Sequence, residues 1–104
     1  MLSESLLSGK LALVTGAASG IGQAISVAYA EAGARVVVTD LTAGACAGTL
    51  ARIRAAGGES RSFALDVTDR EACYALAATV QGDIGDLDIL VNNAGVIIRE
   101  GIDS

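Results

Sequence analysis

The residues with the clearest chemical potential are Gly16, Gly20 and Gly22, which follow the apolar run 11–14 and open an amphipathic stretch that ends near Ala32. The first turn of a helix has backbone N–H groups without partners, and aligned peptide dipoles place partial positive charge there. Glycine lacks a Cβ and tolerates positive φ, so a phosphate can approach such a helix end closely. The glycines alone also fit an ordinary strand-to-helix turn, but their order favours a pyrophosphate-binding loop.

An acidic residue lies where a dinucleotide-binding fold needs one. Asp40 follows the β-branched run 36–39, about 20 residues beyond the glycine loop. A carboxylate at this position accepts hydrogen bonds from the adenosine ribose hydroxyls and repels a 2′-phosphate. Ala17, Ala18 and Leu41 offer no basic side chain that would compensate for that repulsion. NAD is therefore favoured over NADP, although Asp40 by itself is also compatible with a turn carboxylate.

Two motifs together indicate a family. The T-G-x-x-x-G-x-G spacing of residues 15–22 differs from the general G-x-G-x-x-G fingerprint and resembles the short-chain dehydrogenase/reductase family. The sequence N-N-A-G at 92–95, after the apolar run 87–91, resembles the fourth strand of the same family. The resemblance covers nearly the whole chain and well under half of a typical member. It implies an NAD-dependent oxidoreductase that transfers hydride between NAD(H) and a hydroxyl or carbonyl carbon, with sugar acids, other small alcohols and 3-oxoacyl thioesters as open substrate classes.

The resemblance also implies which residues hold the cofactor. Asp66 is expected to bind the adenine amino group with the Val67 backbone beside it, although a helix-start acid is the competing interpretation. Asn93 is expected to brace the fourth strand against neighbouring loops. The residues expected to bind the dinucleotide are Gly16, Ser19, Gly20, Ile21, Gly22, Asp40, Leu41, Asp66, Val67, Asn92, Ala94 and Gly95.

Strand-like and helix-like patterns alternate along the chain, which predicts an α/β fold with a parallel sheet and right-handed crossovers. Strands are expected at 11–15, 35–39, 61–65 and 87–91, in the Rossmann-like order 3-2-1-4. The first two crossover helices then share one face of the sheet, and the third lies on the other. We expect residues 1–104 to form one incomplete domain, truncated after strand four.

Helix signals separate these strands. Thr42 is expected to cap the second helix, which stops near Ala56, and Thr68 with Glu71 resembles a capping box at the start of the third. Helical spacing predicts that the first helix packs on the sheet through Ile21, Ala24, Ile25, Ala28 and Ala32. The same reasoning predicts that the third helix packs through Ala72, Leu76 and Val80.

The composition argues against some classes of binding partner and indicates a cellular compartment. The net charge of −5 argues against nucleic acid or an anionic membrane as partner. No apolar run approaches about 20 residues, and the amino terminus has no basic cluster of a secretory signal. Cys46 and Cys73 lack C-x-x-C spacing, which favours a cytoplasmic protein with two reduced, buried thiols. The sequence has no histidine, so histidine metal sites and histidine bases are excluded.

The chain lacks the proton-transfer residues of the family that it resembles. There a serine, a tyrosine and a lysine act together, but neither Tyr29 nor Tyr74 has a lysine four residues on, and Lys10 is the only lysine. We expect both tyrosines to be packing residues, Lys10 to lie on the surface, and the 104-residue chain to be inactive alone. The full-length protein is expected to bind a dinucleotide and a small-molecule substrate and to form a homo-oligomer. The alternative is a non-catalytic nucleotide-binding or interaction module.

Overall fold

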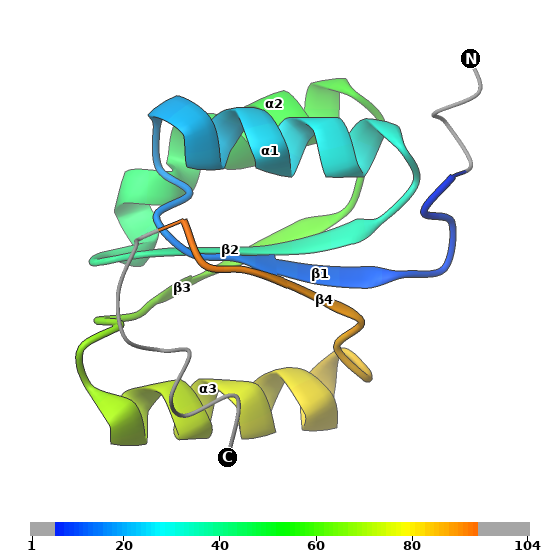
Figure 1. Cartoon of the computed structure of the whole chain (residues 1–104). Helices are drawn as coiled ribbons and strands as arrows, with labels where there is room; N and C mark the ends of the chain where they lie inside the picture. Colours follow the sequence, from blue (N-terminus) through cyan, green and yellow to red (C-terminus); the bar gives the residue numbers. More distant parts are fainter. Residues whose placement is uncertain (1–5, 94–104) are drawn as a thin grey trace.

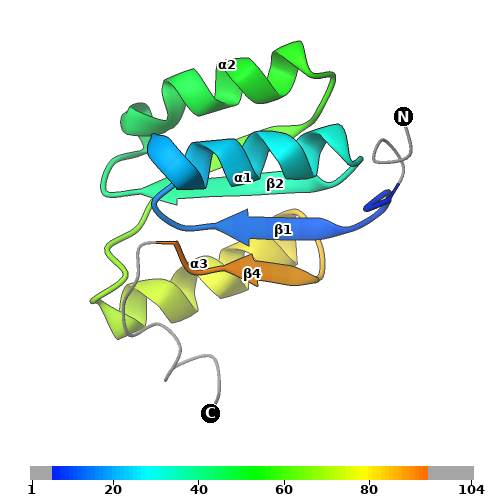
Figure 2. The same cartoon turned by 45° about the horizontal axis from the view of Figure 1, so that its top comes forward.

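A computed structural model describes residues 6–93, which form one parallel sheet between two helical layers (Figures 1 and 2). In chain order the elements are β1 (Leu11–Val14), α1 (Gly20–Glu31), β2 (Arg35–Asp40), the 3₁₀ turn η2 (Ala43–Cys46), α2 (Ala47–Ala55), β3 (Ser60–Ala64), α3 (Arg70–Asp83) and β4 (Ile89–Val91). The sheet has the order β3-β2-β1-β4, and all its pairs are parallel. The predicted fold and strand order are confirmed.

The helices cover the sheet unequally. Figure 1 shows α1 and α2 on one face and α3 alone on the other, which right-handed crossovers require in this strand order. Successive residues of β2 point to opposite faces, so Val36 and Val38 join the core under α1 and α2, whereas Val37 joins Leu76 and Val80 of α3. Burial on both faces explains why the strands are continuous apolar runs.

The stripe predicted for α1 is largely wrong. Its buried residues are Gly22, Ser26 and Ala30. Of the predicted set, Ile25 is half-buried and Ala32 is buried after the helix, but Ile21, Ala24 and Ala28 are exposed. Periodicity favours large apolar side chains, whereas the residues of α1 that are buried are all small. Ser26 is accommodated there because its hydroxyl donates to the carbonyl of Gly22 at 2.7 Å.

The cap predicted before α2 is present, whereas the cap predicted for α3 is not. The Thr42 hydroxyl accepts from the Ala45 N–H at 3.2 Å, so Thr42 is a cap as predicted, but of η2, which leads into α2. The predicted capping box is wrong. Asp69, one residue later, is the N-cap of α3 and accepts from the Ala72 N–H at 3.1 Å, because the Thr68 hydroxyl donates instead to Asp66. The inward residues predicted for α3 are confirmed.

The last strand is shorter than predicted. β4 begins at Ile89 because Asp88 is turned toward β1, where its carboxylate accepts from the Leu11 N–H at 2.8 Å. The helix before it, α3, continues through Gly82 to Asp83. Within residues 6–93, no helix is both long enough and apolar enough to cross a membrane.

Candidate functional site

The glycine loop leaves β1 at the carboxyl edge of the sheet and runs into the first turn of α1. Gly16 and Gly20 have φ values of 62° and 61°, a region that favours glycine. Gly22 is required for a different reason, because a Cβ there would overlap the Gly16 carbonyl and lie 2.7 Å from the amide nitrogen of Asn93. The helix N-terminus is therefore drawn tightly against the strand, and no side chain comes between the loop and the helix.

Asp40 ends β2 directly beside this loop. One carboxylate oxygen accepts from the Ala18 N–H at 3.0 Å, and the other accepts from the Leu41 N–H at 2.9 Å. Ile21 and Leu41 are 70% and 71% exposed, so each presents apolar surface to solvent at this edge. The structure thus brings together the glycine loop and the acid that the sequence singled out.

A second set of contacts holds the loop from α2, and sequence reasoning missed it. The hydroxyl of the fully buried Thr49 donates to the Ala17 carbonyl at 2.6 Å. The Gln23 amide donates to that hydroxyl at 2.9 Å and to the Ala18 carbonyl at 3.3 Å. A threonine and a glutamine within helical patterns carry no signal of such a role, because the partners are backbone atoms of another element.

The ends of β4 and β1 are joined by amide and hydroxyl side chains. The Thr15 hydroxyl lies 3.3 Å from the Asn92 side-chain oxygen, and the Thr15 N–H donates to the Val91 carbonyl. The Asn93 amide donates to the Gly16 carbonyl at 3.0 Å, which agrees with the expected bracing role. Asn92 therefore lies next to the glycine loop, while Ala94 and Gly95, also expected at the cofactor, lie outside the described residues.

Asp66 lies after β3 in a tight local turn. Its carboxylate accepts from the Thr68 hydroxyl at 2.6 Å and from the Thr68 N–H at 2.9 Å. These two hydrogen bonds, the hydroxyl first, hold the pKa of the exposed Asp66 carboxyl below its usual range. Asp66 is thus an ionised acceptor at the carboxyl edge, and the half-buried Val67 follows it. This geometry fits both a helix-start acid and an adenine-binding acid.

The thiols lack the features of reactive cysteines. Cys46 is buried and Cys73 is half-buried, and both are free. Burial first, and then the charge of Asp40, raises the pKa of the Cys46 thiol, so the nucleophilic thiolate is disfavoured. Burial, followed by Asp69 and Asp66, does the same for Cys73. In the described part of the chain, no cluster of three or more acidic, cysteine or histidine side chains could hold a metal ion.

The two tyrosines differ. Tyr29 packs partly against the core under α1, as predicted. Tyr74 is 49% exposed on α3, so its predicted packing role is wrong, because the position faces outward while Cys73 and Leu76 face the sheet. Lys10 is exposed, as expected.

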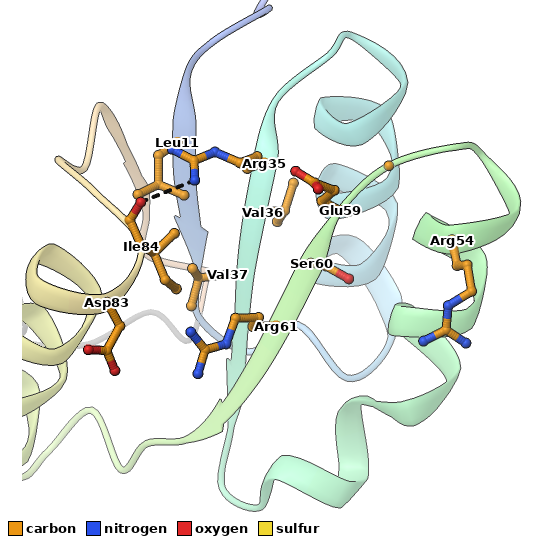
Figure 3. Close-up of a pocket in the computed structure, with 11 residues that line it drawn as sticks. Leu11, Arg35, Val36, Val37, Arg54, Glu59, Ser60, Arg61, Asp83 and Ile84 are labelled. Atoms are coloured by element: carbon orange, nitrogen blue, oxygen red, sulfur yellow. Dashed lines mark hydrogen bonds between the residues drawn. The ribbon is translucent and has the colours of Figure 1, made fainter.

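A cavity of about 440 Å³ lies at the opposite, amino edge of the sheet (Figure 3). Leu11 and Val37 contribute apolar lining, and Arg35, Arg61 and Asp83 contribute charges. Arg35 is occupied with the end of α3, because its guanidinium donates to the Ile84 carbonyl at 3.1 Å. Neither the glycine loop nor Asp40 lines this cavity. It is therefore separate from the site at the carboxyl edge.

Comparisons with known proteins agree with the geometry. A family described as short chain dehydrogenase matches residues 10–104. The D-threitol dehydrogenase of Mycolicibacterium smegmatis is 50% identical over 90 residues, which cover 86% of this chain and 35% of that protein. The 7alpha-hydroxysteroid dehydrogenase of Escherichia coli is 43% identical over 89 residues, which cover 86% of this chain and 35% of that protein.

A solved structure also matches the fold. A metagenomic short-chain oxidoreductase in complex with NADP superposes with a TM-score of 0.85 and 46% identity, over 88% of this chain and 41% of the other. The chain spans about a third of the length of the curated relatives that it matches.

Proposed function

Because the chain belongs to the short-chain dehydrogenase family, we propose that it is the NAD-binding part of an oxidoreductase. The bound nicotinamide would supply hydride transfer to or from a hydroxyl or carbonyl carbon of a small substrate. The names of the D-threitol and 7alpha-hydroxysteroid dehydrogenases support a hydroxyl-bearing substrate. The chain has no Y-x-x-x-K sequence, so its own residues are assigned to binding and orienting the dinucleotide rather than to proton transfer.

The residues at the carboxyl edge fit a pyrophosphate. Gly16, Ser19, Gly20 and Ile21 surround the N-terminus of α1, and a Cβ on Gly20 would meet nothing within 4 Å, so the space before the helix is open. Helix dipole and unpaired N–H groups favour an anion there. We propose that Asp66 and Val67 contact the adenine, and that Asn92, Ala94 and Gly95 contact the rest of the dinucleotide.

The position of Asp40 carries the proposal of NAD over NADP. Its carboxylate lies against the loop, and alanines fill positions 17 and 18 with Leu41 next along the chain, so a 2′-phosphate would meet negative charge without a basic partner. Family membership alone does not choose the cofactor, since one solved relative carries NADP.

The test compares cofactors in the full-length protein. Wild type should show higher kcat/KM with NAD than with NADP, and Asp40→Ala should weaken NAD binding by about 10- to 150-fold, because hydrogen bonds to a charged group contribute about 1.5–3 kcal/mol. Asp40 also holds the Ala18 N–H, but that loss affects both cofactors equally and cancels in the ratio of their dissociation constants.

Asp88→Asn is the matched control. Asp88 also accepts a backbone N–H, but at the amino edge, so the cofactor ratio should be unchanged. A wild-type protein that uses NADP as well as NAD would contradict the proposal.

A further inference from the structure

We propose that Thr49 and Gln23 are positioning residues that fix the peptide planes of loop residues 17–19 and thereby set the affinity for the dinucleotide. The inference rests on the proposed function, and it concerns residues of α2 and α1 rather than the glycines or Asp40.

The peptide between Ala17 and Ala18 is held at both ends. Its carbonyl accepts from the Thr49 hydroxyl at 2.6 Å, and its N–H donates to the Asp40 carboxylate at 3.0 Å. Because carbonyl and N–H point in opposite directions across a trans peptide, these two bonds together fix the rotation of the plane. Loss of either one leaves the plane held from one side only.

Gln23 orients the next peptide, between Ala18 and Ser19. Its carbonyl accepts from the Gln23 amide at 3.3 Å, so the Ser19 N–H must point to the opposite side. Within residues 6–93 that N–H donates to no protein acceptor. A donor aimed away from Gln23, one residue before the helix, is the group that a bound phosphate needs.

The loop needs these side chains because glycines flank it. Gly16 and Gly20 flank the segment in the left-handed region, and glycine rotates more freely than other residues. The Thr49 hydroxyl counters that freedom in two ways, since it donates to the Ala17 carbonyl and accepts from Gln23. Thr49 is fully buried, so water cannot replace the hydroxyl in this arrangement.

The experiment uses the full-length protein with NADH as the probe. Thr49→Val keeps the shape of the side chain and removes the hydroxyl, and we expect the dissociation constant for NADH to rise about 3- to 10-fold. The KM for the dinucleotide should rise with it, while kcat and the KM for the substrate remain unchanged. Thr49→Ser restores the hydroxyl and should restore the affinity. The matched control is Thr79→Val, the same substitution at an exposed position of α3, which should leave NADH binding unchanged.

A purely structural role predicts a different result. It would lower the melting temperature of Thr49→Val without changing the NADH affinity of the folded protein. Gln23→Met, at a half-buried position, carries the test if Thr49→Val does not fold, and a similar loss of affinity is expected. Wild-type affinity in the folded variants would overturn the positioning role alone. Absence of NADH binding by the wild type would instead refute the proposed function.

Discussion

Gly22→Ala should uncouple α1 from the glycine loop and destabilise the full-length protein. The new Cβ would overlap the Gly16 carbonyl and press on the Asn93 amide, so the helix must move outward by roughly 1 Å to reach ordinary contact. Such overpacking costs about 1–3 kcal/mol, and loss of the Asn93–Gly16 hydrogen bond adds about 0.5–1.5 kcal/mol. The total, about 1.5–4.5 kcal/mol, is a large part of the 5–15 kcal/mol typical of a domain.

Urea unfolding of the full-length protein measures this loss, and two other glycines serve as controls. Gly48→Ala, on α2, meets only one side-chain atom at 3.8 Å and should stabilise the helix by about 0.5–1 kcal/mol. Gly20→Ala should cost about 1–2 kcal/mol for its positive φ, and it should lower NADH affinity because the methyl group enters the open space before α1. Wild-type stability and NADH affinity in Gly22→Ala would show that close packing of α1 on the loop is not required.

Three other predictions concern Asp66 and the 104-residue chain by itself. Because its pKa is lowered on folding, Asp66 stabilises the fold above the usual carboxyl pKa, and this contribution disappears as the pH falls through the lowered value. Thr68→Val should raise the Asp66 pKa measured by NMR titration, and an unchanged titration would contradict this. The purified chain should produce no NADH from NAD and any alcohol, followed at 340 nm, since the tyrosine–lysine pair is missing; measurable turnover would show that proton transfer has another source. The chain should also associate, because β4 pairs only with β1 among the described strands and Ile89, Leu90 and Val91 are partly exposed; a monodisperse monomer by light scattering at low micromolar concentration would exclude this.

The strands could be predicted because each is a pattern within one short segment, and the layers follow from the crossovers between them. The β-branched run before Asp40 and the apolar run before Thr15 are buried on both faces, so every residue in them carries the same signal. Parallel strands with helical crossovers then leave few arrangements. The register of β4 could not be predicted in this way, because it depends on Asp88 bonding to Leu11, a residue distant in the sequence.

Local patterns failed at two helix positions where a neighbouring residue or the sheet determines which side chain is used. Helical spacing selected Ile21 for the core of α1, but close contact with the sheet admits Gly22 and Ser26 instead. The capping-box pattern selected Thr68, but its hydroxyl is bonded to Asp66, and Asp69 takes the cap. In both cases the residue that is buried or that caps the helix lies next to the predicted one in the sequence. Contacts in the folded structure determine which of the two takes that role.

The conformation of the glycine loop is fixed by hydrogen bonds from several elements at the carboxyl edge of the sheet. Ala17 is fully buried, so its backbone groups need protein partners. Its N–H donates to the Thr39 carbonyl on β2, and its carbonyl accepts from Thr49 on α2. The Gly16 carbonyl is likewise held by Asn93, which follows β4. Because these bonds all face the protein, the donors left over at Ser19 and the start of α1 face outward. A substitution of Thr49 on α2 or of Asn93 after β4 should therefore change dinucleotide affinity without touching the dinucleotide.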